Sequence, residues 1–439
     1  MKKQYQYPEG YSLLQTTLKT GEFLKDPIRF INKSMEQFGD TYTATVGTQK
    51  MILTKNPEFI DHILRTNQRN YERSEITAKR GAQFFGKGLL FTNGEYWLKQ
   101  RRLIQPAFHR KKIKGLYQNI QKTITDYLAD FPTGEEVDIY PIMQDLSFRV
   151  LIKSLFEIDL SKEIMDELNQ IFADLSSFLL KDVNMPLRKL MYPFTGEERK
   201  HLRKGKRLRE IILGIVNERK ASNGEFHDIL DMLINSRYED TGEAMTEDQL
   251  VDEVQILISA GHETTGNTLS WLMYNLANNS ASQQQLQASI DDSTIDQVMD
   301  NTYLRACISE SMRLFTTSWT SERVAIVDDS FGAYSFPKGT VIAPFFFGVH
   351  RDETLWKDAL HFKPERFIED EKLAKSKKYF PFGAGPRMCI GNSFALAEIS
   401  CFLHTFFQSF KTQTIAKTPA LMPLLTLRPD QVVLKIKKR

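Results

Sequence analysis

The sequence predicts a mainly α-helical protein with small β-sheets, and three segments carry that prediction. A helix-period pattern of apolar residues continues for about thirty residues after Thr246. Two other segments, Thr41–Thr54 and Arg323–Pro344, are rich in β-branched and turn-forming residues, as strands and hairpins are. No internal repeat and no linker rich in glycine, serine or proline divides the 439 residues. We therefore expect one α+β domain over residues 1–439.

The β-rich segments are expected to form hairpins at the edges of the helical part. Polar and β-branched residues alternate on both sides of Gly47 within Thr41–Thr54, which predicts two paired strands. In the second segment, the sequence FPKGT at Phe336–Thr340 predicts a turn, because proline and glycine favour turn geometry. Two apolar runs flank Arg428–Asp430 within Leu424–Ile436 and predict a further hairpin.

The longest predicted helix begins after Thr246. Gln249 follows three residues later, at the spacing of a capping box, and the acidic residues between them favour a helix N-terminus. A helix of about thirty residues is about 45 Å long, the width of a domain, so it must run through the protein interior. Small and polar residues interrupt its apolar pattern at Ala260–Thr265 (AGHETT). That interruption lowers helix stability and therefore suggests a function.

Composition limits the partners and the compartment. The formal net charge is only +3, so we expect no nucleic-acid partner. The three cysteines, Cys307, Cys389 and Cys401, include no CxxC pair, which argues against a disulfide framework and for a reducing compartment. Cys307 and Cys401 lie in helical, apolar patterns and are expected in the core. No uninterrupted apolar run approaches the length of a membrane span, so we expect a cytoplasmic protein without a membrane anchor.

The strongest motif is the sequence FGAGPRMCIG around Cys389. Two glycines and a proline before the cysteine exclude a regular helix and predict a tight loop, and an amphipathic helix follows at Ser393–Phe410. A helix N-terminus favours the thiolate form of a nearby cysteine. Arg387, two residues before the cysteine, is suited to pair with an anionic group of a cofactor.

This FxxGxRxCxG pattern resembles the haem-binding loop of the cytochrome P450 family. The resemblance implies the cytochrome P450 fold, with a long central helix crossing a buried haem b whose iron is held by Cys389. Further matches follow in the family's order and spacing, so the resemblance covers nearly the whole chain. By this resemblance, the cofactor contacts are Trp97 and Arg101 of a WxxxR motif, Ala260, Arg323, Phe382, Arg387 and Cys389.

An ExxR motif and a later PERF motif also match the family. Glu310 and Arg313 share one face of a predicted helix, and Arg366 lies between them and the cysteine loop in sequence. In the family these three residues form a buried ion triad. An isolated ExxR pair is more often a solvated surface salt bridge, and only its position relative to the other motifs makes it informative.

The interrupted helix resembles the family's oxygen-activating segment. Thr264 is expected to donate a hydrogen bond to the carbonyl of Ala260 and to bend the helix. By resemblance, Glu263 relays protons from solvent and Thr264 holds the water that delivers them. These roles imply a monooxygenase, an oxidoreductase that inserts one atom of O2 into a C–H bond of a small organic substrate. The chain has no flavin or iron–sulfur motif, so electrons should come from a ferredoxin or flavodoxin with its reductase.

The substrate prediction comes from a departure from the family pattern. The family often has two prolines shortly after the ExxR motif, whereas Thr316–Glu322 here is rich in hydroxyl groups. Buried hydroxyls without partners are costly, so we expect an oxygenated substrate, for example a methylated sugar that undergoes oxidative O-demethylation. The tryptophan in this segment would be a stacking platform. The expected pocket residues are Gln255, Ser259, Ser318 and Trp319.

Alternative functions stay open at this point. If the hydroxyl groups of Thr316–Glu322 bond to backbone in a turn, a fatty-acid or terpenoid hydroxylase becomes the better prediction. A peroxide-driven peroxygenase would share the thiolate loop but usually lacks an acid–alcohol pair such as Glu263 and Thr264. A non-catalytic haem sensor would need neither a proton relay nor a roomy pocket.

Overall fold

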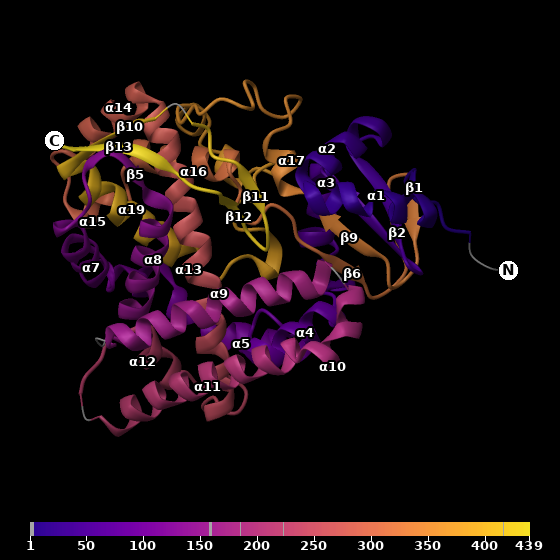
Figure 1. The fold of residues 1–439 in the computed structure, drawn as a ribbon, viewed down its shortest axis with the longest axis horizontal. Coiled ribbons are helices and arrows are strands. Elements are labelled where there is room, and N and C mark those ends of the chain that lie inside the picture. Colours follow the sequence, from indigo (N-terminus) through magenta and orange to yellow (C-terminus); the bar gives the residue numbers. More distant parts are fainter. Residues whose placement is uncertain (1–3, 158–159, 185, 223, 416) are drawn as a thin grey trace. The chain divides into compact units, whose positions relative to one another are not determined.

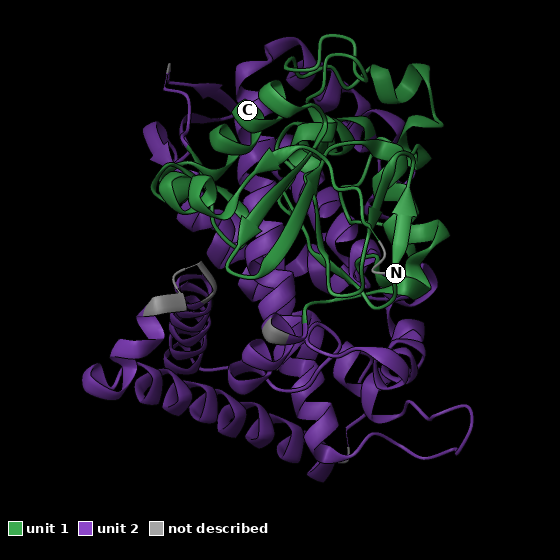
Figure 2. Cartoon of the chain, turned by 90° about the vertical axis from the view of Figure 1, so that its right-hand side faces the viewer, with its two compact units in different colours: residues 1–74, 306–389, 421–428 green, residues 75–305, 390–420, 429–439 purple. Residues whose placement is uncertain are grey.

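The computed structural model describes residues 4–157, 160–184, 186–222, 224–415 and 417–439, and helices dominate it (Figure 1). This mixture of many helices with small sheets confirms the predicted fold class. Separate stretches of the chain form two compact units, coloured differently in Figure 2. Unit 1 comprises residues 1–74, 306–389 and 421–428, and unit 2 comprises residues 75–305, 390–420 and 429–439. The expectation of a single domain over residues 1–439 stays a prediction.

Unit 1 contains a six-stranded sheet in the order β1-β2-β3-β9-β6-β4. The predicted first hairpin is present, because β2 (Thr41–Val46) pairs antiparallel with β3 (Gln49–Thr54) around Gly47. β3 then pairs in parallel with β9 (Val341–Pro344), which pairs antiparallel with β6 (Arg323–Ala325). The outer strands are β1 (Gly10–Tyr11) and β4 (Tyr71–Glu72), and a separate hairpin consists of β7 (Asp329–Phe331) and β8 (Tyr334–Phe336).

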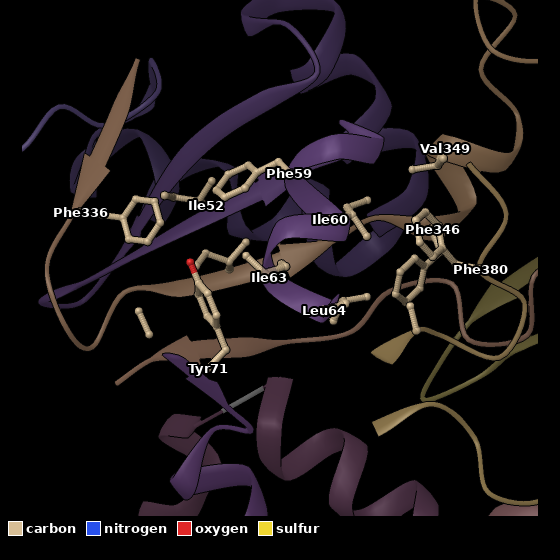
Figure 3. Close-up of a cluster of buried hydrophobic side chains, with 13 residues drawn as sticks. Ile52, Phe59, Ile60, Ile63, Leu64, Tyr71, Phe336, Phe346, Val349 and Phe380 are labelled. Carbon is tan, nitrogen blue, oxygen red and sulfur yellow. The ribbon is translucent and has the colours of Figure 1, made fainter. Parts of the chain in front are cut away.

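A buried apolar cluster joins this sheet to the segment that precedes the cysteine loop (Figure 3). Ile52 of β3 contributes from the sheet, and Phe59 contributes from α3 (Pro57–Asp61). Phe380, nine residues before Cys389, belongs to the same cluster. The cluster therefore anchors the chain shortly before the loop that carries the cysteine.

The helices of unit 1 are mostly short. Pro27 and Gly39 mark the two ends of α2, which matches the usual preference for proline in the first turn and glycine after the last. α16 carries the ExxR motif and spans the stretch where the chain passes into unit 1. The bounds are α1 (Leu13–Lys25), α2 (Pro27–Phe38), α16 (Thr302–Leu314), α17 (Phe346–His350) and α18 (Arg366–Glu369).

Unit 2 is built around α13 (Glu247–Asn278), the long helix that the sequence predicted. Its capping box is present, because the side chains of Thr246 and Gln249 each accept a hydrogen bond from the other's backbone N–H. α13 packs against α8 (Ile139–Phe156), and a Cβ at Gly261 would lie only 3.0 Å from an α8 side chain. Most side chains in the second half of α13 are buried, so the helix runs through the interior of its unit.

Several of the remaining helices of unit 2 pack against α13 or α8. The helix after the cysteine loop begins one residue earlier than predicted, and Cys401 on it is fully buried. Among the described residues, no helix combines the length and the apolar character needed to cross a bilayer. The main bounds are α4 (Glu75–Phe85), α5 (Gly94–Ile104), α6 (Arg110–Lys114), α7 (Tyr117–Ala129), α9 (Lys162–Asn184), α11 (Glu197–Ala221), α12 (Ile229–Ile234), α14 (Ser280–Ile290) and α19 (Asn392–Ser409).

The predicted C-terminal hairpin is wrong. β12 (Leu427–Pro429) pairs with β11 (Leu421–Pro423), whereas β13 (Val433–Lys438) lies between β10 (Phe410–Thr414) and β5 (Gly134–Asp138) in a different sheet. Each apolar run therefore has its own partner elsewhere in the chain. The pairing of β13 with two other strands buries its inward side chains Leu434 and Ile436 to 0% and 1% exposure, which a two-stranded hairpin in water would not achieve.

Candidate functional site

The loop before α19 presents Cys389 on the surface of unit 1, where its side chain is exposed. Gly383 and Gly385 have φ angles of 71° and 70°, in the left-handed region that favours glycine. A Cβ at Gly385 would lie 1.7 Å from the carbonyl oxygen of Leu64, so no other residue fits there. The Cys389 N–H donates to the carbonyl of Phe382 at 3.0 Å and closes the loop. Gly383 and Gly385 are thus required by the shape of the loop that carries the sulfur.

Three arginines concentrate positive charge in unit 1. Arg323, at the start of β6, is only 7% exposed and donates to the backbone carbonyl of Glu322 at 2.6 Å. Burial, followed by the charges of Arg73 and Arg387, lowers the pKa of Arg323 to about 9. Burial also lowers the pKa of Arg73, although the Glu322 carboxylate opposes that shift. Several like charges at a buried position are stabilised by binding an anion.

The predicted ion triad is present and buried. Glu310 accepts hydrogen bonds from Arg313 Nε at 2.8 Å and from Arg366 Nε at 3.0 Å. It also accepts the backbone N–H of Lys363 at 2.9 Å. Arg313 Nη1 donates to the carbonyls of His350 and Ala359, at 2.6 and 2.7 Å. Each buried charge therefore has several partners, which is the condition under which burial of ions is tolerated.

His350, which no sequence motif indicates, connects this triad to the segment just before the cysteine loop. Its ring Nε2 accepts the backbone N–H of Phe380 at 2.7 Å, and its Nδ1 faces the hydroxyl of Thr316. Burial, followed by the charge of Arg313, lowers the pKa of His350 to about 3, so the ring is neutral at physiological pH. A neutral ring that accepts at Nε2 must carry its proton on Nδ1 and donate it to Thr316.

Arg73 is the second functional candidate that sequence reasoning missed. It belongs to no recognised motif and lies two residues beyond Tyr71, at the end of the short strand β4. β4 reaches Arg323 only through its pairing with β6, in which Tyr71 faces Ala325. The pairing of strands about 250 residues apart in sequence is not readable from one chain, so Arg73 could not be found beforehand.

In unit 2, α13 stays helical through the interrupted segment. Thr264 Oγ1 donates to the carbonyl of Ala260 at 2.7 Å, the bond that the sequence predicted. Ser147 of α8 donates to the carbonyl of His262 at 3.2 Å. Burial lowers the pKa of His262 to about 4, and its ring contacts Phe148 edge-on, so it is a neutral packing residue. Ala260 is exposed within this helix, and Thr264 is half-buried.

Two of the predicted pocket residues do not have the expected environment. Gln255 is 1% exposed and precedes Thr264 by nine residues, or about 2.5 helical turns, so it lies on the opposite face of α13. Trp319 is 7% exposed, packs edge-on against Phe345 and donates its Nε1–H to the carbonyl of Leu424 at 3.0 Å. Core packing and a backbone bond account for Trp319, so its predicted place in the pocket is wrong. The Nε2 of Gln255 is buried and has no hydrogen-bond partner among the described residues, so its place in the pocket stays a prediction.

The other predicted residues keep positions compatible with a site. Trp97 is buried and Arg101 half-buried on α5 in unit 2, and their spacing places them on one helical face. Glu263 is half-buried on α13. Ser259 is half-buried and Ser318 is exposed, and the described residues provide neither side chain with a contact that decides its role.

A family model described as "Cytochrome P450" matches residues 6–439. The chain belongs to the cytochrome P450 family. It is therefore a haem-binding monooxygenase, an oxidoreductase that uses O2 and electrons from a redox partner.

Several known cytochromes P450 resemble this one along most of its length. The cyclooctat-9-en-7-ol 5-monooxygenase of Streptomyces melanosporofaciens is 28% identical over 89% of this chain and 86% of that protein. Pentalenene oxygenase of Streptomyces avermitilis is 25% identical over 89% and 88% of the two chains. The heme domain of cytochrome P450DA matches with a TM-score of 0.85 over 95% of each chain at 21% identity, which supports the fold alone.

The residues of unit 1 fit a haem. A thiol on a rigid loop is a suitable iron ligand, and the loop of Cys389 is held by its own backbone bond and by the close approach to Leu64. The positive charges of Arg323, which is buried, and of Arg73 and Arg387, which are half-buried, match a group that carries two carboxylates. The chemistry of this donor set therefore agrees with the family.

Proposed function

We propose that this cytochrome P450 binds haem b (iron protoporphyrin IX) through Cys389 and hydroxylates an apolar, terpenoid-like substrate. When bound, the haem iron activates O2 and supplies the oxygen atom for insertion into a C–H bond. Arg73, Arg323 and Arg387 would hold the haem propionates from unit 1. By the family's WxxxR motif, Trp97 and Arg101 would also bind a propionate.

Thr264 and Glu263 are the residues that we propose to manage protons. The O–H of Thr264 is committed to the Ala260 carbonyl, so its oxygen lone pairs are left to accept a hydrogen bond from water. That arrangement fixes the orientation of the water without consuming the proton that it carries. Glu263, half-buried on the same helix, can exchange protons with solvent and pass them to this water.

The single observation that carries the substrate proposal is the internal bonding of the hydroxyl-rich segment. Thr316 donates to the carbonyl of Met312 at 3.0 Å, and Thr320 donates to the carbonyl of Pro344 at 2.9 Å. Ser321 accepts from Arg323 at 3.2 Å. These groups are satisfied without a polar ligand, and Trp319 belongs to the core. The sequence argument for a methylated sugar therefore loses its basis.

The relatives support the terpenoid alternative. The names of cyclooctat-9-en-7-ol 5-monooxygenase and pentalenene oxygenase denote cyclic, largely hydrocarbon terpenoid substrates. An apolar substrate gains most of its binding free energy from loss of contact with water, and needs few hydrogen bonds from the pocket.

We also propose a cytoplasmic enzyme that receives electrons from a ferredoxin or flavodoxin. Arg102 on α5 and the lysines Lys111, Lys112 and Lys114 on α6 are exposed basic residues of unit 2. A basic surface attracts acidic electron-transfer proteins and accelerates their association at low salt. Lys99 contributes less to the positive charge of this surface, because its Nζ pairs with the Asp240 carboxylate at 2.8 Å.

Binding titrations followed by the haem spin-state spectrum test the substrate class. We expect cyclic terpene alkenes and alcohols to shift the spectrum, and methylated sugars to leave it unchanged. Fatty acids form the third arm, because the same apolar pocket could accept them. A response to methylated sugars alone would overturn the terpenoid proposal and restore the demethylation hypothesis.

A further inference from the structure

Two adjacent acidic side chains of α13 hold the loop of residues 86–93, which connects α4 and α5. Asp252 accepts the backbone N–H of Lys87 at 2.8 Å, and Glu253 accepts the backbone N–H of Leu89 at 2.9 Å. All of these residues belong to unit 2. The loop is therefore attached to the long helix by its backbone, through two side chains of the helix.

The loop lies on the face of α13 that carries Thr264. A Cβ at Gly88 would lie 2.7 Å from the side chain of Ile256 and 3.0 Å from the carboxyl group of Glu253, so loop and helix are in close contact. Glu253 precedes Ala260 by seven residues and Thr264 by eleven, close to two and three helical turns, so the three share one face. A displaced loop would alter the surroundings of that face.

The two acidic residues differ in their electrostatic surroundings. Asp252 is paired with Arg209 of α11, a short contact that keeps its carboxylate charged, and Arg209 also binds Asp248. Glu253 is 1% exposed and has no ion pair within the described part of the chain. Its second oxygen, Oε1, is buried and has no hydrogen-bond partner among the described residues. Only one of the two carboxyl groups that hold the loop therefore has a cation to balance its charge.

Burial is the main reason why the pKa of Glu253 is raised to about 8; the bond from Leu89 opposes the shift, and the charge of Asp252 adds to it. The hydroxyls of Tyr96 on α5 and Tyr238 before α13 are the other titratable groups nearby. Their pKa values are also raised, mainly by burial, so both are neutral at physiological pH. Within the described part of the chain, no neighbouring group therefore compensates a negative charge on Glu253.

We propose that Glu253 is a positioning residue that keeps loop 86–93 closed on α13 while its carboxyl group is protonated, and that its ionisation releases the loop. The effect on substrate binding rests on the proposed function, whereas the loop motion itself does not. In the open loop the carboxyl group would be hydrated and would titrate near its ordinary value of 4.5. The equilibrium constant for opening the loop then rises by up to about tenfold for each pH unit between about 4.5 and about 8. Above that range it no longer changes with pH.

Hydrogen exchange of the Lys87 and Leu89 amides in the haem-loaded protein, measured between pH 6 and 9, tests the loop motion. After correction for the intrinsic exchange rate, we expect protection in the wild type to fall by up to about tenfold per pH unit until about pH 8. Glu253→Gln keeps an oxygen acceptor but cannot ionise, so its protection should not depend on pH. Equal pH profiles for wild type and Glu253→Gln would overturn the proposal.

Glu398→Gln is the matched control. Glu398 lies on α19, is 1% exposed, and has its pKa raised to about 8 by burial, but its neighbour is Ser147 of α8 and not the loop. We expect this variant to keep the wild-type pH profile at Leu89. Infrared absorption supplies a second test if Glu253→Gln does not fold. In Glu398→Gln, a band of a buried protonated carboxyl should be present at pH 6 and vanish near pH 8; its absence at pH 6 would overturn the proposal.

Substrate titration separates this proposal from the proposed function. If the loop borders the pocket, the Kd for a cyclic terpene alcohol should rise with pH in the wild type and stay constant in Glu253→Gln. A terpene that binds neither variant, while Leu89 exchange still follows the predicted profile, would refute the substrate class and leave the loop mechanism intact. If Leu89 exchange had the same pH profile in wild type and Glu253→Gln while the terpene still bound, the loop mechanism would be refuted and the substrate class would stand.

Discussion

The two units fix their functional side chains by different physical means. In unit 1, ion pairs and hydrogen bonds to the backbone hold the segment before the cysteine loop. Glu310 and Arg313 form an ion pair within the triad, Arg313 donates to the His350 carbonyl, and the His350 ring accepts the N–H of Phe380. In unit 2, α13 provides a long regular helix, and several of its hydroxyl groups, such as that of Thr264, donate to carbonyls of the helix itself. Damage to unit 1 should therefore reduce folding and haem incorporation, whereas damage to the polar groups of α13 should reduce turnover in a protein that still folds.

The largest effect is expected for Glu310→Ala. This change leaves Arg313 and Arg366 without their carboxylate, and removal of one partner from a buried ion pair costs about 3–5 kcal/mol. We expect little soluble, haem-loaded protein, and a large loss of unfolding free energy in urea for any that is obtained. A variant with wild-type stability and haem content would contradict the structural role of the triad.

Thr264→Ala should sharpen the comparison from the side of unit 2. Loss of the hydroxyl removes the proposed water-holding group, so we expect product formation per electron consumed to fall by about tenfold or more. The unfolding free energy should change by less than about 1 kcal/mol, because one bond within a helix is lost. Thr268→Ala is the control, since Thr268 makes the same kind of bond, to the Thr264 carbonyl at 2.8 Å. Equal losses of coupling in both variants would refute the specific role of Thr264.

His350→Gln should change the pH dependence of stability. The pKa of His350 is lowered to about 3 in the folded protein, from an ordinary value of 6.5. The unfolded chain therefore binds the proton first, so stability is complete above pH 6.5 and is lost as pH falls from there toward 3, by up to about 1.4 kcal/mol per unit. The pKa of His262 is lowered to about 4, so this residue adds a second loss of stability as the pH falls.

Urea unfolding at several pH values between 4 and 8 measures this slope. His350→Gln should flatten it relative to the wild type, at a cost of about 1–3 kcal/mol at pH 7 from the lost bond to Phe380. An unchanged slope would mean that His350 is not neutral in the folded protein. The variant His262→Gln provides the corresponding measurement for unit 2.

The smallest effects are expected at positions 318 and 319, and the larger of the two belongs to Trp319→Phe. This change removes the bond to the Leu424 carbonyl and should lower the unfolding free energy by about 1 kcal/mol, with little effect on ligand affinity. Ser318→Ala, at the exposed neighbouring position, should change stability by less than about 0.5 kcal/mol. A large loss of ligand affinity in Trp319→Phe but not in Ser318→Ala would show that Trp319 contacts the substrate.

Features set by neighbours in sequence could be predicted from the sequence. The capping box at Thr246, the bond between Thr264 and Ala260, and the shared helical face of Glu310 and Arg313 all depend on spacings of three or four residues. The left-handed glycines of the cysteine loop were likewise readable, because proline and glycine allow few conformations there. Such local features make up most of the candidate site.

Features set by distant partners could not be predicted. Arg73 approaches Arg323 only through the pairing of β4 with β6. Trp319 is drawn into the core by Phe345 and by the Leu424 carbonyl, 105 residues further along the chain. The C-terminal strands illustrate the same limit, because a turn-like sequence at Arg428–Asp430 favoured a hairpin while the longer pairings decided the structure.

The absorption spectrum of the reduced, CO-bound protein tests the central claim, a bond between the Cys389 sulfur and haem iron. The wild type and Cys401→Ala, which alters a buried thiol elsewhere, should both show the strongly red-shifted Soret band of a thiolate-ligated haem. Cys389→Ala should lose that band. A red-shifted band that persists in Cys389→Ala, or that is absent from the haem-loaded wild type, would contradict the account.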